Sequence, residues 1–123
     1  MVQRKRGKSG RAPIALVTGA AAGLGFELSK LYAEAGYGLV LVDSDTGRLQ
    51  STADRLKNRY GVAVTPIAQD LGDTGAPDRI SRELTGSGLT PDVIITREGF
   101  RVYGPFPKAD FQKELHPVCR DYQ

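Results

Sequence analysis

The sequence has few of the side chains that build disulfides and zinc sites. It contains one cysteine, Cys119, one histidine, His116, and no tryptophan. A single cysteine forms no disulfide within its own chain, so we expect a reducing, cytoplasmic setting. Structural zinc sites take about four cysteine or histidine ligands, so that class of metal site is excluded and we expect no bound metal.

Long apolar runs are also missing. The longest have four or five residues, as in Leu39–Val42, whereas a helix that spans a bilayer needs roughly 20. Near the N-terminus, Ile14–Val17 follows basic residues, but Thr18 and Gly19 end the run well short of a secretory signal. We therefore expect neither a membrane span nor export.

Acidic residues are absent from the first eleven positions, which we expect to form a flexible basic tail. This tail holds five of the 17 basic residues, namely Arg4, Lys5, Arg6, Lys8 and Arg11. The remaining 12 basic residues face 14 acidic ones, so the body of the chain offers no positive surface for a nucleic-acid backbone. Binding of an anionic surface through the tail is one alternative function.

Residues 12–99 alternate between short apolar runs and amphipathic stretches, as expected for one α/β domain. Continuous apolar runs predict buried strands at 14–17, 39–42, 62–67 and 93–95. Apolar residues at steps of three and four predict the intervening helices. Their stripes are Leu24, Leu28, Leu31 and Ala35; Leu49, Ala53, Leu56 and Tyr60; and, in a weaker helix at 72–86, Ile80 and Leu84.

Turn and cap residues predict where these helices begin and end. Ser44 or Asp45 is suited to cap the second helix, and Gly61 to stop it. Pro77 fits the first turn of the third helix. After Gly99 the pattern lapses into proline-rich sequence, so we expect an irregular tail over residues 100–123.

A glycine-rich turn joins the first strand to the first helix. In this turn, Gly19 allows a tight bend, while Gly23 and Gly25 allow backbone to approach a pyrophosphate and helix to pack on strand. The N–H groups at the start of the helix then face the anion. The turn predicts a nucleotide-binding site whose candidate contacts are Thr18, Gly19, Ala22, Gly23, Leu24 and Gly25.

Asp43 ends the second strand, 18 residues beyond Gly25. An acid at this place in a mononucleotide-binding fold hydrogen-bonds the adenosine ribose hydroxyls, and its charge repels a 2′-phosphate. No arginine follows it directly, so the sequence favours NAD over NADP. The alternative interpretation is an acid at a helix N-terminus on a solvated turn.

These residues resemble the short-chain dehydrogenase/reductase family. The residues Thr18, Gly19, Gly23 and Gly25 match its Thr-Gly-x-x-x-Gly-x-Gly turn. The resemblance covers about residues 12–121, and only the N-terminal, nucleotide-binding half of a family member. It implies a Rossmann-like, three-layer α/β/α fold with a parallel sheet of about four strands in the order 3-2-1-4, truncated after the fourth. It also implies an oxidoreductase lineage with a nicotinamide dinucleotide.

The resemblance adds three further candidate contacts with the cofactor. Asp70 and Leu71 match the family's Asp-Leu/Val pair, in which the aspartate meets the adenine amino group. Gly99 aligns with the glycine of its Asn-Asn-Ala-Gly segment, although Thr96, Arg97 and Glu98 replace the other three residues.

The family's catalytic serine and Tyr-x-x-x-Lys motif have no match, so the sequence offers no catalytic residue. No tyrosine is followed four residues later by lysine. We therefore expect dinucleotide binding without turnover, and a non-catalytic interaction module is the other alternative. In a sheet that ends at the fourth strand, residues 92–96 would form an exposed apolar edge, which predicts self-association.

Overall fold

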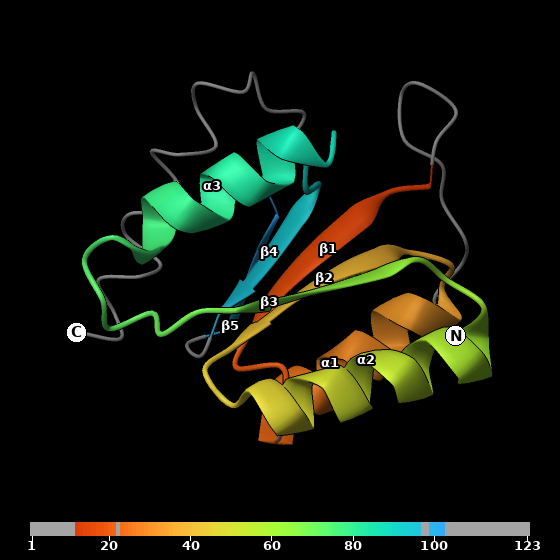
Figure 1. Cartoon of the computed structure of the whole chain (residues 1–123). Coiled ribbons are helices and arrows are strands. Elements are labelled where there is room, and N and C mark those ends of the chain that lie inside the picture. Colours follow the sequence, from red (N-terminus) through yellow and green to blue (C-terminus); the bar gives the residue numbers. More distant parts are fainter. Residues whose placement is uncertain (1–11, 22, 97–98, 103–123) are drawn as a thin grey trace.

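The computed structural model describes residues 12–21, 23–96 and 99–102, in which a twisted sheet lies between helices (Figure 1). Its strands follow the order β3-β2-β1-β4-β5. The first four are parallel: β1 (Ile14–Thr18), β2 (Gly38–Asp43), β3 (Val64–Ala68) and β4 (Val93–Thr96). The predicted Rossmann-like fold and the strand order 3-2-1-4 are confirmed.

Helices cover both faces of the sheet. The helices α1 (Gly23–Glu34) and α2 (Thr46–Tyr60) lie on one face, and α3 (Ala76–Gly86) lies on the other (Figure 1). Successive strand residues therefore point into different cores: Val17 and Leu41 face α1 and α2, whereas Leu16 and Val40 face the α3 side. Burial on both faces explains the continuous apolar runs of β1, β2 and β4, whereas β3, at the edge of the sheet, is only partly buried.

The helix ends follow the predicted cap chemistry. The carboxylate of Asp45 accepts a hydrogen bond from the backbone N–H of Arg48 at 3.0 Å, which makes Asp45 the N-cap of α2. Gly61 ends that helix in the left-handed conformation, with φ 68°. Pro77 lies in the first turn of α3, where its missing N–H removes no helical hydrogen bond.

The apolar stripe predicted for α1 is wrong in part. Leu24 and Leu31 are 61% and 49% exposed, whereas Ser29 and Ala33 are the buried residues of this helix. Small side chains on the inner face allow the helix axis to approach the sheet closely. The stripe of leucines is thereby rotated away from the core, and only Leu28 of the three packs partly against it.

The end of the sheet also differs from expectation. Residues Gly99–Val102 form β5, which pairs antiparallel with β4 and places Gly99 opposite Thr96. The irregular tail therefore does not begin at residue 100, and β4 is an internal strand. The prediction of an exposed apolar edge at residues 92–96 is therefore wrong, and the argument for self-association through that edge no longer holds. The basic tail and residues 103–123 lie outside the described residues.

Two absences hold for the described part of the chain. None of its helices has both the length and the apolar character needed to cross a membrane. Among the same residues, no group of three or more histidine, cysteine, aspartate or glutamate side chains is arranged to hold a metal ion.

The contrast between α1 and α2 gives a stability test. Leu56 of α2 is 2% exposed, so Leu56→Ala should lower the free energy of unfolding by about 2–5 kcal/mol. Leu31→Ala removes the same atoms from a half-exposed site and should cost less than about 1 kcal/mol. Urea unfolding followed by circular dichroism measures both variants. Equal losses would contradict the observed orientation of α1.

Candidate functional site

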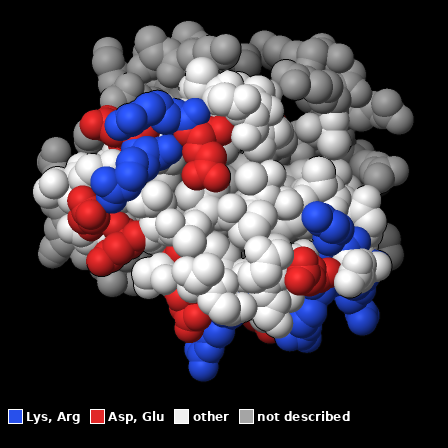
Figure 2. Space-filling model, in the orientation of Figure 1, with Lys and Arg blue, Asp and Glu red and all other residues white. Residues whose placement is uncertain are grey.

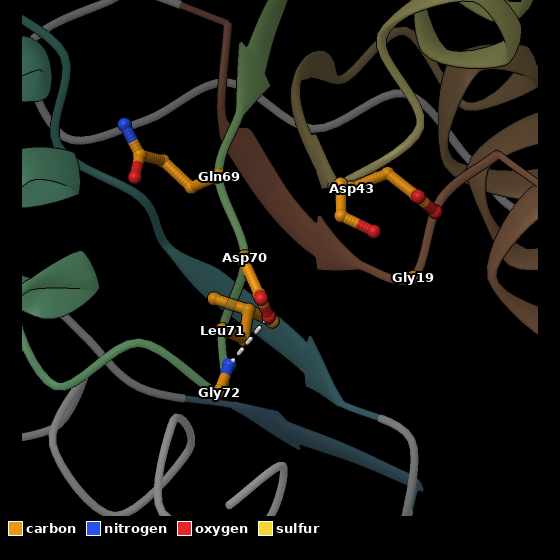
Figure 3. Close-up of a pocket in the computed structure, with 7 residues that line it drawn as sticks. Gly19, Asp43, Gln69, Asp70, Leu71 and Gly72 are labelled. Carbon is orange, nitrogen blue, oxygen red and sulfur yellow. Dashed lines mark hydrogen bonds between the residues drawn. The ribbon is translucent and has the colours of Figure 1, made fainter.

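A pocket of about 250 Å³ opens where β1, β2 and β3 end (Figure 3). It is lined by Gly19, Asp43, Ser44, Gln69, Asp70, Leu71 and Gly72. Parallel strands bring their carboxyl ends to one edge of the sheet, and ligands of open α/β sheets bind in crevices at this edge. The pocket thus joins the glycine-rich turn to the ends of two neighbouring strands.

Asp43 connects two segments beside this pocket. One carboxylate oxygen, Oδ2, accepts a hydrogen bond from the backbone N–H of Ala21 at 3.1 Å. The other, Oδ1, accepts from the backbone N–H of Asp45 at 3.0 Å. The carboxylate therefore fixes the glycine-rich turn to the start of α2, and each oxygen keeps a lone pair for a further donor.

The glycine-rich turn is also bonded to the backbone of β2. Gly19 and Ala20 donate their N–H groups to the carbonyl of Val42 at 2.9 and 3.3 Å. Both Gly19 and Gly23 have positive φ, 65° and 63°, which favours glycine at each position. Because β2 and Asp43 take the first N–H groups of the turn, donors for an anion must come from the first turn of α1.

Gly25 is required for a different reason, which is space. A Cβ atom at this position would overlap the carbonyl oxygen of Gly19 and lie 2.9 Å from its carbonyl carbon. The first turn of α1 therefore lies directly against the bend that leaves β1. Ser29, one turn further on, donates its hydroxyl to the carbonyl of Gly25 at 2.7 Å.

The loop after β3 forms the other wall of the pocket. The Asp70 carboxylate accepts a hydrogen bond from the backbone N–H of Gly72 at 2.9 Å (Figure 3). The carbonyl of Asp70 accepts from the N–H of Asp73 at 3.0 Å. Leu71 is 6% exposed and packs into the core on the α3 side. The loop is thus anchored by an apolar side chain while Asp70 remains exposed to solvent.

Comparison with known proteins identifies the family. The model of the short chain dehydrogenase family matches residues 13–116. The chain belongs to this family. It is 37% identical over 91 residues to the 1-deoxy-11-beta-hydroxypentalenate dehydrogenase of Streptomyces arenae, covering 74% of this chain and 31% of that protein. It is 29% identical over 106 residues to the very-long-chain 3-oxoacyl-CoA reductase of Phaeosphaeria nodorum, covering 85% and 31%.

A solved structure of the same family shows the same fold. L-sorbose reductase from Gluconobacter frateurii, complexed with NADPH and L-sorbose, superposes with a TM-score of 0.67 at 27% identity. The match covers 69% of this chain and 32% of that one. The chain thus spans about a third of the length of these short-chain dehydrogenases, and the part that it spans is an oxidoreductase nucleotide-binding fold.

The structure brings together part of the set of site residues that the sequence predicts for this member of the family. Gly19, Asp43, Asp70 and Leu71 line the pocket. Four other predicted residues do not line it: Gly23, Leu24 and Gly25 open α1, and Gly99 opens β5. Ala22 lies outside the described residues.

Thr18 is buried within the sheet and links two of its strands. It is 3% exposed and donates its hydroxyl to the carbonyl of Ile95 at 3.2 Å, which ties β1 to β4. It does not line the pocket, whereas Ser44, Gln69 and Gly72 do, although the sequence did not predict them as site residues. The signal that was available for these three is their position next to Asp43, Asp70 and Leu71 at the ends of strands.

The close approach at Gly25 predicts a loss of stability on substitution. Gly25→Ala should lower the free energy of unfolding by about 1–3 kcal/mol, because the added methyl group overlaps the backbone of Gly19, which would have to shift. Gly86→Ala is the matched control, since no heavy atom lies within 4 Å of its Cβ position. The control should be neutral or stabilising by up to about 1 kcal/mol. Thermal unfolding compares the two, and an undamaged Gly25→Ala protein would refute the close packing.

Proposed function

We propose that the chain binds a nicotinamide dinucleotide in this pocket and prefers NAD(H) to NADP(H). The observation that carries the proposal is the Asp43 carboxylate, which lies at the end of β2 on the wall of the pocket. Two backbone hydrogen bonds already hold it in position. Ribose hydroxyls add two donors to a fixed, charged acceptor, which is a strong class of hydrogen bond.

The rest of the pocket supports a division of the cofactor into three parts. Asp70 and Leu71 provide the wall for adenine, as the resemblance to the family implies. Asp43 receives the ribose. The pyrophosphate is received by the first turn of α1, whose N–H groups and dipole favour an anion, with the Gly19 backbone lining the pocket beside it.

The charge of the pocket supports NAD over NADP. Among the described residues that line it, Asp43 and Asp70 are acidic and none is basic. Arg48 is the nearby cation in sequence, but its Nε lies 3.8 Å from the Asp45 carboxylate, with which it is paired. A 2′-phosphate would therefore be repelled by the Asp43 carboxylate, and no basic side chain among the described lining residues would offset this repulsion.

Titration calorimetry with NAD and NADP tests this preference. The wild-type protein should bind NAD at least about tenfold more tightly, since a charge-assisted hydrogen bond contributes about 1.5–3 kcal/mol. Asp43→Asn should reduce the ratio of the two affinities severalfold, and Asp54→Asn, an acid of α2 outside the pocket, should leave it unchanged. The ratio is the readout because damage to the turn weakens both ligands alike. Equal affinity of the wild-type protein for both would refute the role of Asp43.

We also propose that residues 1–123 bind the cofactor without catalysing hydride transfer. The proposal rests on the sequence, which contains no Tyr-x-x-x-Lys, the proton donor and its lysine in this family. Without a positioned acid or base, a rate factor of about 10²–10⁴ is lost.

The purified chain should therefore show no NAD(P)-dependent oxidation or reduction of alcohols, aldehydes or ketones. Absorbance at the wavelength of the reduced nicotinamide measures turnover, and the Gly25→Ala protein serves as the background control for contaminating enzymes. A wild-type rate clearly above this control would contradict the proposal, and would leave the NAD preference to be judged by calorimetry.

A further inference from the structure

Arg79 lies in α3 and its side chain reaches back to the loop that forms the adenine wall. Its Nε donates a hydrogen bond to the Gln69 side-chain oxygen at 2.8 Å. Its Nη2 lies 2.9 Å from the Asp73 carboxylate. One guanidinium group therefore holds two residues that are four positions apart, at the two ends of the loop.

The backbone around this contact leaves room for the guanidinium. A Cβ atom at Gly75 would lie 2.7 Å from Nη1 of Arg79, so the group passes close over the Gly75 backbone. The Asp73 carboxylate also accepts a hydrogen bond from the N–H of Gly75 at 2.8 Å. This bond and the Arg79 guanidinium lower the pKa of Asp73, so the carboxylate stays ionised at a lower pH than that of a free aspartate.

The segment between the two held residues is part of the pocket wall. Gln69 and Asp73 bracket Asp70, Leu71 and Gly72, all three of which line the pocket. Leu71 is fixed by burial, but Asp70 is exposed and is held only by local backbone bonds within the loop. Through Gln69 and Asp73, the Arg79 side chain links both ends of this loop to α3, and the exposed Asp70 lies between them.

We propose that Arg79 is a positioning residue for adenine recognition, acting as a clamp that sets the place of Asp70 through Gln69 and Asp73. The inference rests on the proposed function, because it assumes that an adenine nucleotide occupies the pocket. Arg79 does not line the pocket and so acts through the loop rather than on the ligand.

The chemistry of arginine makes this role testable. A planar guanidinium presents several N–H groups in a fixed fork and bonds two acceptors at once, whereas a lysine ammonium is a single point charge. Arg79→Lys therefore keeps the charge and breaks the clamp, and Arg79→Met removes both. Acidic and basic side chains are intermixed over α3 (Figure 2). Arg82 is the matched control, because it lies on the same helix about one turn further on and, among the described residues, makes no hydrogen bond or ion pair with the loop.

The experiment is calorimetry with adenosine and inosine 5′-monophosphates on the wild-type chain and the Arg79→Lys, Arg79→Met and Arg82→Met variants. The inosine nucleotide carries an oxygen in place of the adenine amino group that Asp70 is proposed to meet. Both Arg79 variants should bind the adenosine nucleotide about threefold to tenfold more weakly and the inosine nucleotide nearly as before, so discrimination between the bases falls. Arg82→Met should retain both affinities, and circular dichroism should show the same helix content in all four proteins.

The outcomes separate the clamp from its premises. Wild-type affinity in Arg79→Lys with a loss in Arg79→Met would mean that only charge matters, and would overturn the clamp. An equal loss for both nucleotides would mark a general effect on folding or on phosphate attraction, and would overturn it as well. If the wild-type protein bound neither nucleotide, the proposed function itself would fail, and the adenine role of Arg79 with it.

Discussion

The two hydrogen bonds to the Asp43 carboxylate hold together the segments on which the site depends. One is donated by the N–H of Ala21 in the glycine-rich turn, and the other by the N–H of Asp45, the residue that caps α2. The carbonyl of Val42, one residue earlier, accepts from the same turn. The end of β2 thus determines the path of the chain after β1 and the start of the second helix. A side chain without acceptors at position 43 would leave two N–H groups to find other partners, at a cost of about 1–3 kcal/mol each where they are shielded from water.

The parallel sheet supplies what local contacts do not. Because β1, β2 and β3 run in the same direction, the turn, Asp43 and the Asp70 loop meet at one edge although they are far apart in the sequence. Thr18 fixes the fourth strand to the same arrangement through the carbonyl of Ile95. The close contact of Gly25 with Gly19 then places the first turn of α1 against this edge. The position of the pocket is therefore a consequence of strand order and packing rather than of any one motif.

The sequence predicts the parts of this structure that depend on local patterns. Buried strands are continuous apolar runs, and the Asp45 cap and the Gly61 stop follow from backbone chemistry within a few residues. The orientation of α1 was not predictable in the same way, because its leucines repeat at helical spacing while Ser29 and Ala33, which face the sheet, carry no strong apolar signal. Strand β5 follows β4 closely in the sequence, but its run of four residues is too short to predict a strand by itself. The contact of Gln69 with Arg79 joins side chains ten residues apart across a loop, and no pattern in a short window of sequence predicts it.

The dual use of Asp43 connects the stability of the turn with the proposed choice of cofactor. An aspartate fits this position on structural grounds alone, since an asparagine would turn one of the two acceptor oxygens into a donor that faces a backbone N–H. The same hydrogen bonds fix the carboxylate before any ligand arrives, so the ordering of this side chain costs nothing at the moment of binding. A ligand with two neighbouring hydroxyls therefore gains from an acceptor that the fold has already placed. A ligand with a phosphate at the same point meets a charge that the fold cannot move without releasing the glycine-rich turn.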